Sequence, residues 1–149
     1  PMAAAARATL AGASGGCQAE CGAAAAMGAA ALVTVRGGSA DAVSHAVALT
    51  FKSILGLVCD PVGGLVECPC VKRNAMLVSL GTLGADMALA GVKSLIPADE
   101  VIDAMGQIGR EMDVRYRETA GGGLAATPTG RRLAKERLVQ LKPRKGPKS

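Results

Sequence analysis

Apolar residues recur at helical spacing in several stretches of the chain, beginning with an alanine-rich run. A first helix is predicted from about Gln18 to Val35, and Gly37 and Gly38 follow it as helix-stopping residues. A second helix is predicted from its cap at Ser39 to Gly56. The apolar residues on one face of this second helix are Val43, Val47, Phe51, Ile54 and Leu55.

Two further helices are predicted in the second half of the chain. The third runs from about Val71 to Ala90, and the fourth runs from Pro97 to near Arg117. Asp99 and Glu100 lie in the first turn of the fourth helix, where negative charge is favoured. The third helix is predicted from the helical spacing of Met76, Leu80, Leu83 and Met87, and the buried stripe of the fourth is predicted to be Val101, Met105, Ile108 and Met112.

Glycine and proline interrupt the helical pattern in two places. Residues 57–69 include Asp60-Pro61 and Gly63-Gly64 and lead into Cys68-Pro69-Cys70, which together exclude a continuous helix. A second loop contains Gly121-Gly122-Gly123, and no segment shows the alternation typical of a strand. The sequence therefore predicts an all-α fold, a compact bundle of about four to six helices with glycine-rich loops that carry cysteines.

The composition indicates how these helices pack. The 149 residues include 20 glycines but one Phe, one Tyr and no Trp, and half of the residues are apolar. A chain of this length forms one domain with a single core. Small side chains let helix backbones approach closely, so we expect tightly packed helices.

The formal charge of +5 comes from the end of the chain, because residues 131–149 carry eight Lys or Arg and one acid. We therefore predict a domain over residues 1–132 and a basic tail over residues 133–149, partly disordered from residue 142 on. A solvated tail is favoured over a nucleic-acid-binding arm, since no stacking aromatics accompany the charge. No nucleic-acid partner is expected.

The N-terminal part does not have the pattern of a membrane or export signal. The uncharged run from Cys21 to Val35 has 15 residues, fewer than the roughly 20 that span a bilayer, and is interpreted as a buried helix. Residues 1–9 lack the order of a signal peptide, and a start at Pro1 is typical of a cut from a longer polypeptide. We expect a cytoplasmic protein without a membrane partner.

Five cysteines in such a chain argue for metal binding or catalysis and against a disulfide framework. Cys17, Cys59 and Cys70 each follow a glycine- or proline-containing turn, and Cys17 and Cys70 begin helices, where thiolates are stabilised. Cys21 and Cys68 are each either a further ligand or a small buried hydrophobe. The spacing alone leaves the presence of a metal site open, because it is not that of a zinc ribbon or a ferredoxin.

Longer motifs sharpen this picture. Residues 15–20, 59–76, 85–91, 118–119 and 122–125 closely resemble the C-terminal part of the alpha chain of iron–sulfur L-serine dehydratases. The resemblance covers residues 12–132, which is nearly the whole predicted domain. It identifies that domain as the iron–sulfur catalytic domain of such an alpha chain, and it most resembles the two-subunit bacterial form.

The resemblance implies a cofactor and a reaction. Cys17, Cys59 and Cys70 would hold a 4Fe-4S cluster whose fourth iron acts as a Lewis acid in eliminating the serine hydroxyl, giving pyruvate and ammonia. Cys21 and Cys68 would be buried hydrophobes, because the family commonly has valine there. The implied partners are L-serine and a separate beta chain, in a homo- or hetero-oligomer.

Candidate substrate-binding residues lie near these cysteines. Arg73 is a candidate for gripping the substrate carboxylate or, equally, for pairing with a surface carboxylate, and Asn74 would orient the substrate or bond to the turn. Gly122 and Gly123 would let backbone N–H groups approach a carboxylate, or simply connect elements. His45 is interpreted as a partly buried or surface helix residue and not as a catalytic one. The general base is expected elsewhere in the alpha chain or in the beta chain, so this chain alone is expected to be inactive.

Two other functions remain open at this stage. An iron–sulfur L-cysteine desulfidase resembles the same domain and would expel hydrosulfide in place of hydroxide. A non-catalytic metal-binding domain would instead hold zinc with Cys17, Cys21, Cys68 and Cys70. Cys59 distinguishes the iron–sulfur hypothesis from the zinc hypothesis, because it is a ligand only in the former.

Overall fold

A computed structural model describes residues 2–140 of the chain, and this part is all-helical, as predicted. The one strand-like feature among the described residues is an isolated parallel bridge between Cys59 and Arg117. Three short 3-10 segments, Val62–Gly64, Val114–Tyr116 and Gly123–Ala126, lie in the loops. The α-helices are α1 (Met2–Arg7), α2 (Gly12–Gly15), α3 (Cys17–Val35), α4 (Ala40–Lys52), α5 (Cys70–Leu89), α6 (Ala98–Glu111) and α7 (Pro128–Gln140).

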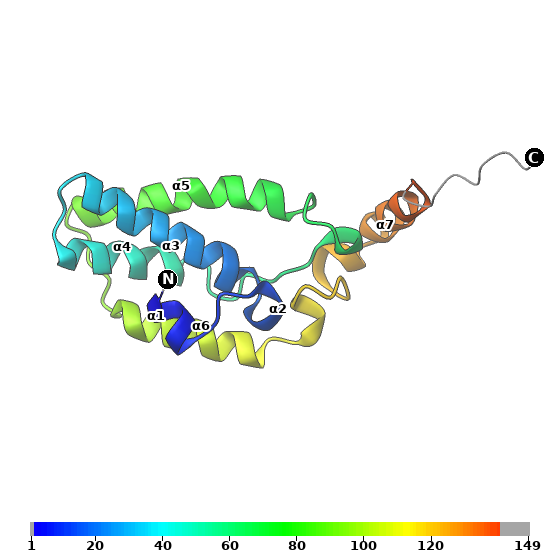
Figure 1. The fold of residues 1–149 in the computed structure, drawn as a ribbon, viewed down its shortest axis with the longest axis horizontal. Coiled ribbons are helices and arrows are strands. Elements are labelled where there is room, and N and C mark those ends of the chain that lie inside the picture. The colour runs from blue at the N-terminus through cyan, green and yellow to red at the C-terminus, as the bar shows by residue number, and fades with distance from the viewer. Residues whose placement is uncertain (1, 141–149) are drawn as a thin grey trace, which may run out of the picture.

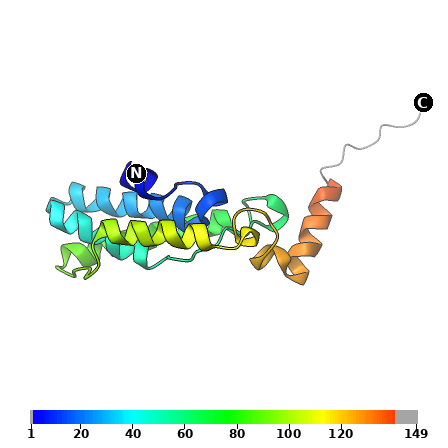
Figure 2. The same ribbon diagram turned by 90° about the horizontal axis from the view of Figure 1, so that it is seen from below.

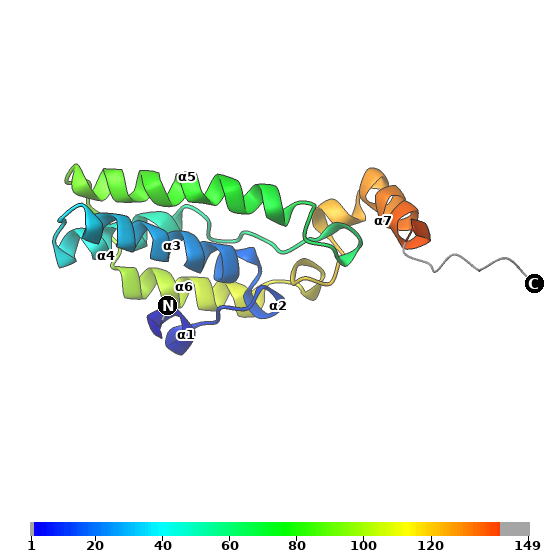
Figure 3. The same ribbon diagram turned by 45° about the horizontal axis from the view of Figure 1, so that its top comes forward.

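The long helices form an elongated bundle around α3, which lies lengthwise between α5 and α6 (Figures 1 and 3). The chain enters α3 and α5 at the same end of the bundle, and α4 runs in the opposite direction to both (Figure 1). The short helices α1 and α2 lie beside α6. Helix α7 projects from the end of the bundle at which α3 and α5 begin (Figure 2).

Small side chains let α3 and α5 approach closely, as the composition predicts. A Cβ atom placed on Gly81 of α5 would lie 2.7 Å from the backbone oxygen of Ala25 in α3. On the other side of α3, Phe51, Ile102 and Met105 form a buried cluster with several alanines. The core is therefore built mainly from alanine and glycine contacts between helices, with a few large side chains.

Most predicted helix boundaries agree with the structure to within one or two residues. The hydroxyl of Ser39 caps α4 by accepting a hydrogen bond from the N–H of Ala42 at 3.1 Å, as predicted. α4 ends at Lys52, four residues before the predicted stop at Gly56.

The predicted end of the fourth helix near Arg117 is wrong, because α6 ends at Glu111. Met112 adopts extended backbone geometry, and the N–H of Cys59 then donates to the oxygen of Tyr116 at 2.8 Å. Pairing with the Cys59 segment replaces the last helical turn. Two short helices, α1 and α2, were not predicted, because their alanine- and glycine-rich residues carry no periodic pattern.

Two predictions concern segments that the structure describes only partly or places differently. Helix α7 runs across the predicted boundary between residues 132 and 133, and the predicted disordered segment 142–149 lies outside the described residues.

Helix α3 is long and apolar enough to cross a membrane by length and composition alone. Ten of its 19 residues are buried in the bundle, which is typical of a core helix.

Candidate metal centre

Three elements bring Cys17, Cys59 and Cys70 to one end of the bundle. Cys17 is the first residue of α3, Cys70 is the first residue of α5, and Cys59 lies in the irregular segment between α4 and α5. The side chains are 1%, 3% and 8% exposed, in the order Cys17, Cys59, Cys70. The three cysteines that the sequence singles out are therefore buried at the start of two helices and on the loop beside them.

The thiols meet at Cys17. Cys17, Cys21 and Cys59 pack in one buried cluster, and Cys70 lies close enough for its pKa to respond to the Cys17 charge. The hydrogen bond from Cys21, followed by those from Arg73 and Cys59, outweighs burial and lowers the pKa of Cys17 to about 6. The structure thus gives the centre one stabilised thiolate.

The neighbouring thiols are held in their neutral form when no cation is bound. Burial, followed by the nearby Cys17 charge, raises the pKa of Cys59 and of Cys70. The hydrogen bond to Cys17, followed by burial, raises the pKa of Cys21. A bound cationic centre would reverse this order, since metal-coordinated thiols lose their protons.

The donor set suits an iron–sulfur centre. Three buried sulfurs with no oxygen or nitrogen ligand form a soft ligand set, which favours iron–sulfur clusters, zinc or copper(I). Within residues 2–140, no three or more His, Cys, Asp or Glu side chains are arranged to hold a single metal ion. In a cluster each cysteine binds a different iron, so convergence of three separate segments is the feature that such a group needs.

The two remaining cysteines differ from each other. Cys21 is buried and contacts Cys17, in agreement with the hydrophobe interpretation. Cys68 is exposed, so the prediction that it is a buried hydrophobe is wrong. The cause is the turn at residues 66–69, in which Cys68 is exposed, whereas Cys70 in the helix that follows is buried. The zinc alternative would need this exposed thiol beside three buried ones.

Arg73 lies one turn after Cys70 and points into the same region. Its Nη2 donates to Asp60 Oδ1 at 3.1 Å, and its Nη1 donates to the backbone oxygen of Val58 at 2.8 Å. Burial opposes the charge of Arg73, but the contacts with Cys17 and Asp60 raise its pKa. Its partner is a buried carboxylate, so the alternative of a surface ion pair is wrong. Binding of a substrate carboxylate stays a prediction.

Asp60 is the residue that sequence reasoning missed. It is 2% exposed, and its Oδ2 accepts a hydrogen bond from the N–H of Leu124 at 2.8 Å. Gly123 has a φ of 57°, and a Cβ atom there would lie 2.9 Å from Asp60 Cγ. The loop of Gly122 and Gly123 therefore approaches this carboxylate, and the glycine is required there by both conformation and space.

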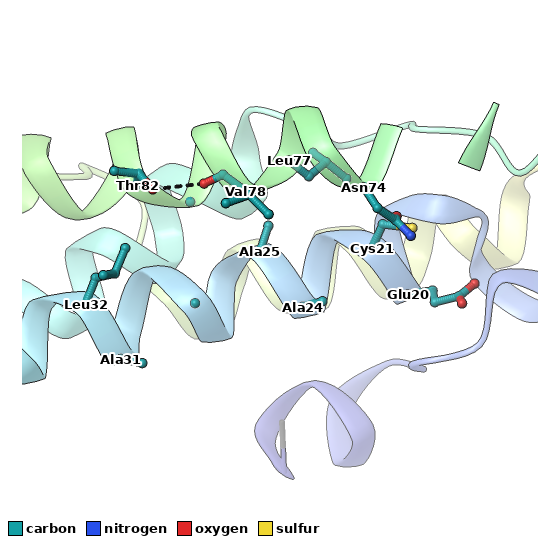
Figure 4. A pocket seen from close by; sticks show the side chains of 12 residues that line it. Glu20, Cys21, Ala24, Ala25, Ala31, Leu32, Asn74, Leu77, Val78 and Thr82 are labelled. Atoms are coloured by element: carbon teal, nitrogen blue, oxygen red, sulfur yellow. Dashed lines mark hydrogen bonds between the residues drawn. The ribbon is translucent and has the colours of Figure 1, made fainter. Parts of the chain in front are cut away.

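Asn74 is exposed at one end of a groove between α3 and α5 with a volume of about 600 Å³. Glu20 and Cys21 lie at the same end of the groove, next to Asn74 (Figure 4). The rest of the groove is lined by small and apolar side chains, including Ala24 and Val78. Asn74 is thus accessible to a ligand in this groove, unlike Arg73.

His45 and Gln18 each form hydrogen bonds to the backbone of another segment. His45 lies on α4, where its Nδ1 accepts from the N–H of Ser94 at 3.2 Å, and of the two predicted settings, partly buried or surface, the structure shows the first. Gln18, fully buried beside Cys17, donates to the oxygens of Gly15 and Met105 at 2.9 and 3.2 Å. The one sequence signal for this bridging role of Gln18 is a polar residue at the start of an alanine-rich helix.

Comparison with known proteins identifies the family of the chain. A family model described as the serine dehydratase alpha chain matches residues 1–125. The chain belongs to the serine dehydratase alpha-chain family. Within this family it is 60% identical over 129 residues to the probable L-serine dehydratase alpha chain of Bacillus subtilis. That match covers 87% of this chain and 43% of the relative.

Other family members show the same partial coverage. The L-serine dehydratase alpha chain of Peptoniphilus asaccharolyticus is 53% identical over 133 residues, which are 89% of this chain and 46% of that protein. L-serine dehydratase 1 of Escherichia coli is 42% identical over 119 residues, which are 79% of this chain and 26% of that protein. The chain thus spans about half the length of the alpha chains it matches and a quarter of the longer enzyme.

Proposed function

We propose that the chain is the cluster-binding part of an L-serine dehydratase alpha chain, with Cys17, Cys59 and Cys70 as ligands of a 4Fe-4S cluster. The observation that carries this proposal is the burial of these three thiols together at the end of the bundle where α3 and α5 begin. The names of the relatives support serine as the substrate. When bound, the cluster would supply an iron without a protein ligand as a Lewis acid for the serine hydroxyl.

The reaction eliminates water from L-serine, and hydrolysis of the resulting enamine gives pyruvate and ammonia. The chain's own contribution is to hold three thiolates at one end of the bundle and to shield them from solvent. Arg73 compensates negative charge at the Cys17 sulfur from within the protein. Asn74 is exposed beside Cys21 at the end of the α3/α5 groove. Its side-chain amide, which can both donate and accept hydrogen bonds, is therefore placed to contact a substrate.

The rest of the active site belongs to other parts of the enzyme. The base that removes the α-proton is assigned to the remainder of the alpha chain or to a beta chain, and this chain alone is inactive. Buried free thiols and an oxygen-sensitive centre fit a cytoplasmic enzyme, where the thiols stay reduced. Arg73 is the less suitable clamp for the substrate carboxylate, because its donors already serve Asp60 and Val58.

The function is tested with the alpha chain of natural length, prepared anaerobically together with its beta chain. Pyruvate formation from L-serine and sulfide release from L-cysteine are measured in the same preparation. We expect serine to be the preferred substrate, and Cys59→Ser to abolish activity. Cys68→Ser is the matched control, because Cys68 is exposed, and it should retain activity. A Cys59→Ser protein as active as the control contradicts the proposal.

A further inference from the structure

One buried ion pair contacts all three cysteine segments. Asp60 directly follows Cys59, and Arg73 lies three residues after Cys70 on α5. The Arg73 guanidinium also lies close enough to Cys17 on α3 for its charge to lower the pKa of that thiol. The side chains of Asp60 and Arg73 are 3% and 17% exposed, so the pair is shielded from solvent.

Both oxygens of the Asp60 carboxylate are used inside the chain. Oδ1 accepts from Arg73 Nη2 at 3.1 Å, and Oδ2 accepts from the N–H of Leu124 at 2.8 Å. The second bond joins residues 64 positions apart and fixes the turn that begins at Gly123 against the cysteine loop. Asp60 thus fixes the Arg73 guanidinium and the turn at Gly123 relative to Cys59.

Arg73 in turn depends on this carboxylate. A partly buried guanidinium is costly unless a charged partner compensates it. Its Nη1 bond to the oxygen of Val58 fixes the residue before Cys59 as well. Asp60 and Val58 each hold one Nη atom of Arg73, so the planar guanidinium is fixed between the Cys59 loop and α5.

We propose that Asp60 is a positioning residue that holds Arg73 against the Cys17 sulfur, and that Arg73 thereby stabilises added negative charge on the bound cluster. This inference rests on the proposed function, because it concerns the cluster that Cys17, Cys59 and Cys70 bind. Hydrogen bonds and charges beside the sulfurs are the protein's means of setting the cluster's reduction potential. Loss of Arg73 should therefore make the cluster harder to reduce.

The test is a redox titration of the cluster in the anaerobic protein of natural length. We compare the wild type with Asp60→Asn, Arg73→Gln, Arg73→Lys and the double variant Asp60→Asn/Arg73→Gln. Asp86→Asn and Arg36→Gln are matched controls, because Arg36 and Asp86 form an exposed ion pair in another part of the bundle. The midpoint potential of the controls should equal that of the wild type.

We expect Arg73→Gln to shift the midpoint potential in the negative direction. We expect Asp60→Asn to shift it in the same direction, because displacement of Arg73 from Cys17 outweighs the loss of the Asp60 charge. The double variant should shift it no further than Arg73→Gln alone, because Asp60 acts through Arg73. Arg73→Lys, which keeps the charge, should lie between the wild type and Arg73→Gln. Shifts that add in the double variant, or potentials that stay at the wild-type value in both single variants, contradict the proposal.

A second measurement covers variants that lose the cluster. Amide hydrogen exchange at Leu124 in the metal-free protein should be at least about tenfold faster in Asp60→Asn, since a hydrogen bond to a charged acceptor is removed. Unchanged exchange contradicts the positioning role of Asp60 whatever the cluster does. A wild-type protein that binds no iron while Leu124 stays protected contradicts the proposed function and the charge effect. The two failures are therefore distinguishable.

Discussion

The two ends of the bundle are built by different means. At the end that carries the cysteines, side chains of Gln18, Asp60 and Arg73 bond to backbone groups or to each other in buried surroundings. At the opposite end, a glycine turn and the Ser39 cap join α3 to α4, and the ion pair of Arg36 and Asp86 is exposed. The first end depends on particular side chains, and the second depends on local turn geometry.

The comparison shows that the end of the bundle that carries the cysteines has the less regular backbone. Irregular backbone at the cysteine end leaves buried N–H and C=O groups that only side chains can satisfy. Two non-glycine residues nearby, Glu118 and Ala120, have φ values of 64° and 55°, which are strained conformations for such residues. Glu118 also donates its N–H to the oxygen of Cys59 at 2.9 Å. Substitutions at this end should therefore cost more than comparable ones at the other.

The largest effect is expected at Gln18. Gln18→Leu would remove the partners of the oxygens of Gly15 and Met105 and of the N–H of Gly56, all at the cysteine end. Each lost partner costs about 1–3 kcal/mol. Chemical denaturation should show a loss of at least about 3 kcal/mol. Gln107→Leu, on the exposed face of α6, is the control and should change stability by less than about 0.5 kcal/mol. An equal loss of stability in Gln18→Leu and Gln107→Leu would contradict the claim that the buried side-chain hydrogen bonds at the cysteine end stabilise the fold.

A pH titration sharpens the comparison at the thiols. In the metal-free protein the pKa of Cys17 is lowered to about 6, chiefly by the hydrogen bond from Cys21, against an ordinary value of 9.0. The stabilisation from this thiolate is complete above about pH 9 and is lost as the pH falls through 6. Ultraviolet absorbance of thiolates should rise by one group with a midpoint near pH 6. The same rise in Cys17→Ser would assign that thiolate to another residue.

The middle of the bundle should respond to side-chain size. Gly81→Ala would place a methyl group 2.7 Å from the oxygen of Ala25 and force α3 and α5 apart. We expect a loss of about 1–3 kcal/mol, measured by thermal or chemical unfolding. Gly28→Ala on α3 meets no atom within 4 Å and should raise stability by up to about 1 kcal/mol. A destabilised Gly28→Ala protein would show that this face is already covered.

The smallest effect is expected at the opposite end. Ser39→Ala removes the cap of α4 and should cost about 1 kcal/mol in unfolding experiments. Ser79→Ala, at an exposed position of α5, should cost nothing measurable. Neither change should alter the absorbance titration of the thiols. A change in that titration on removal of the Ser39 cap would show that the two ends are coupled.

Periodicity and turn signals predict much of the fold. The four long helices, the Ser39 cap and the three candidate ligands follow from residues that act locally, such as helix-stopping glycines and cysteines after turns. The family motifs then add the chemistry. Local signals are strongest where the chain is regular, which explains why the helices were predicted better than the loops.

Contacts between distant segments could not be predicted. The bond between Asp60 and the N–H of Leu124 joins residues 64 positions apart, and the premature end of α6 is caused by pairing with Cys59. Exposure of Cys68 follows from the direction of one turn, which composition does not encode. Sequence pattern indicates the face on which a residue lies, whereas the partner on that face is a property of the folded chain.

The central claim is that Cys17, Cys59 and Cys70 together hold one cluster. Its most direct test is the iron and acid-labile sulfide content of the anaerobically purified protein, measured in the wild type, Cys59→Ser and Cys68→Ser. We predict about four irons and four sulfides per chain in the wild type and in Cys68→Ser, and a clear loss of both in Cys59→Ser. Full iron and sulfide content in Cys59→Ser, or one zinc in place of iron in the wild type, would contradict the account.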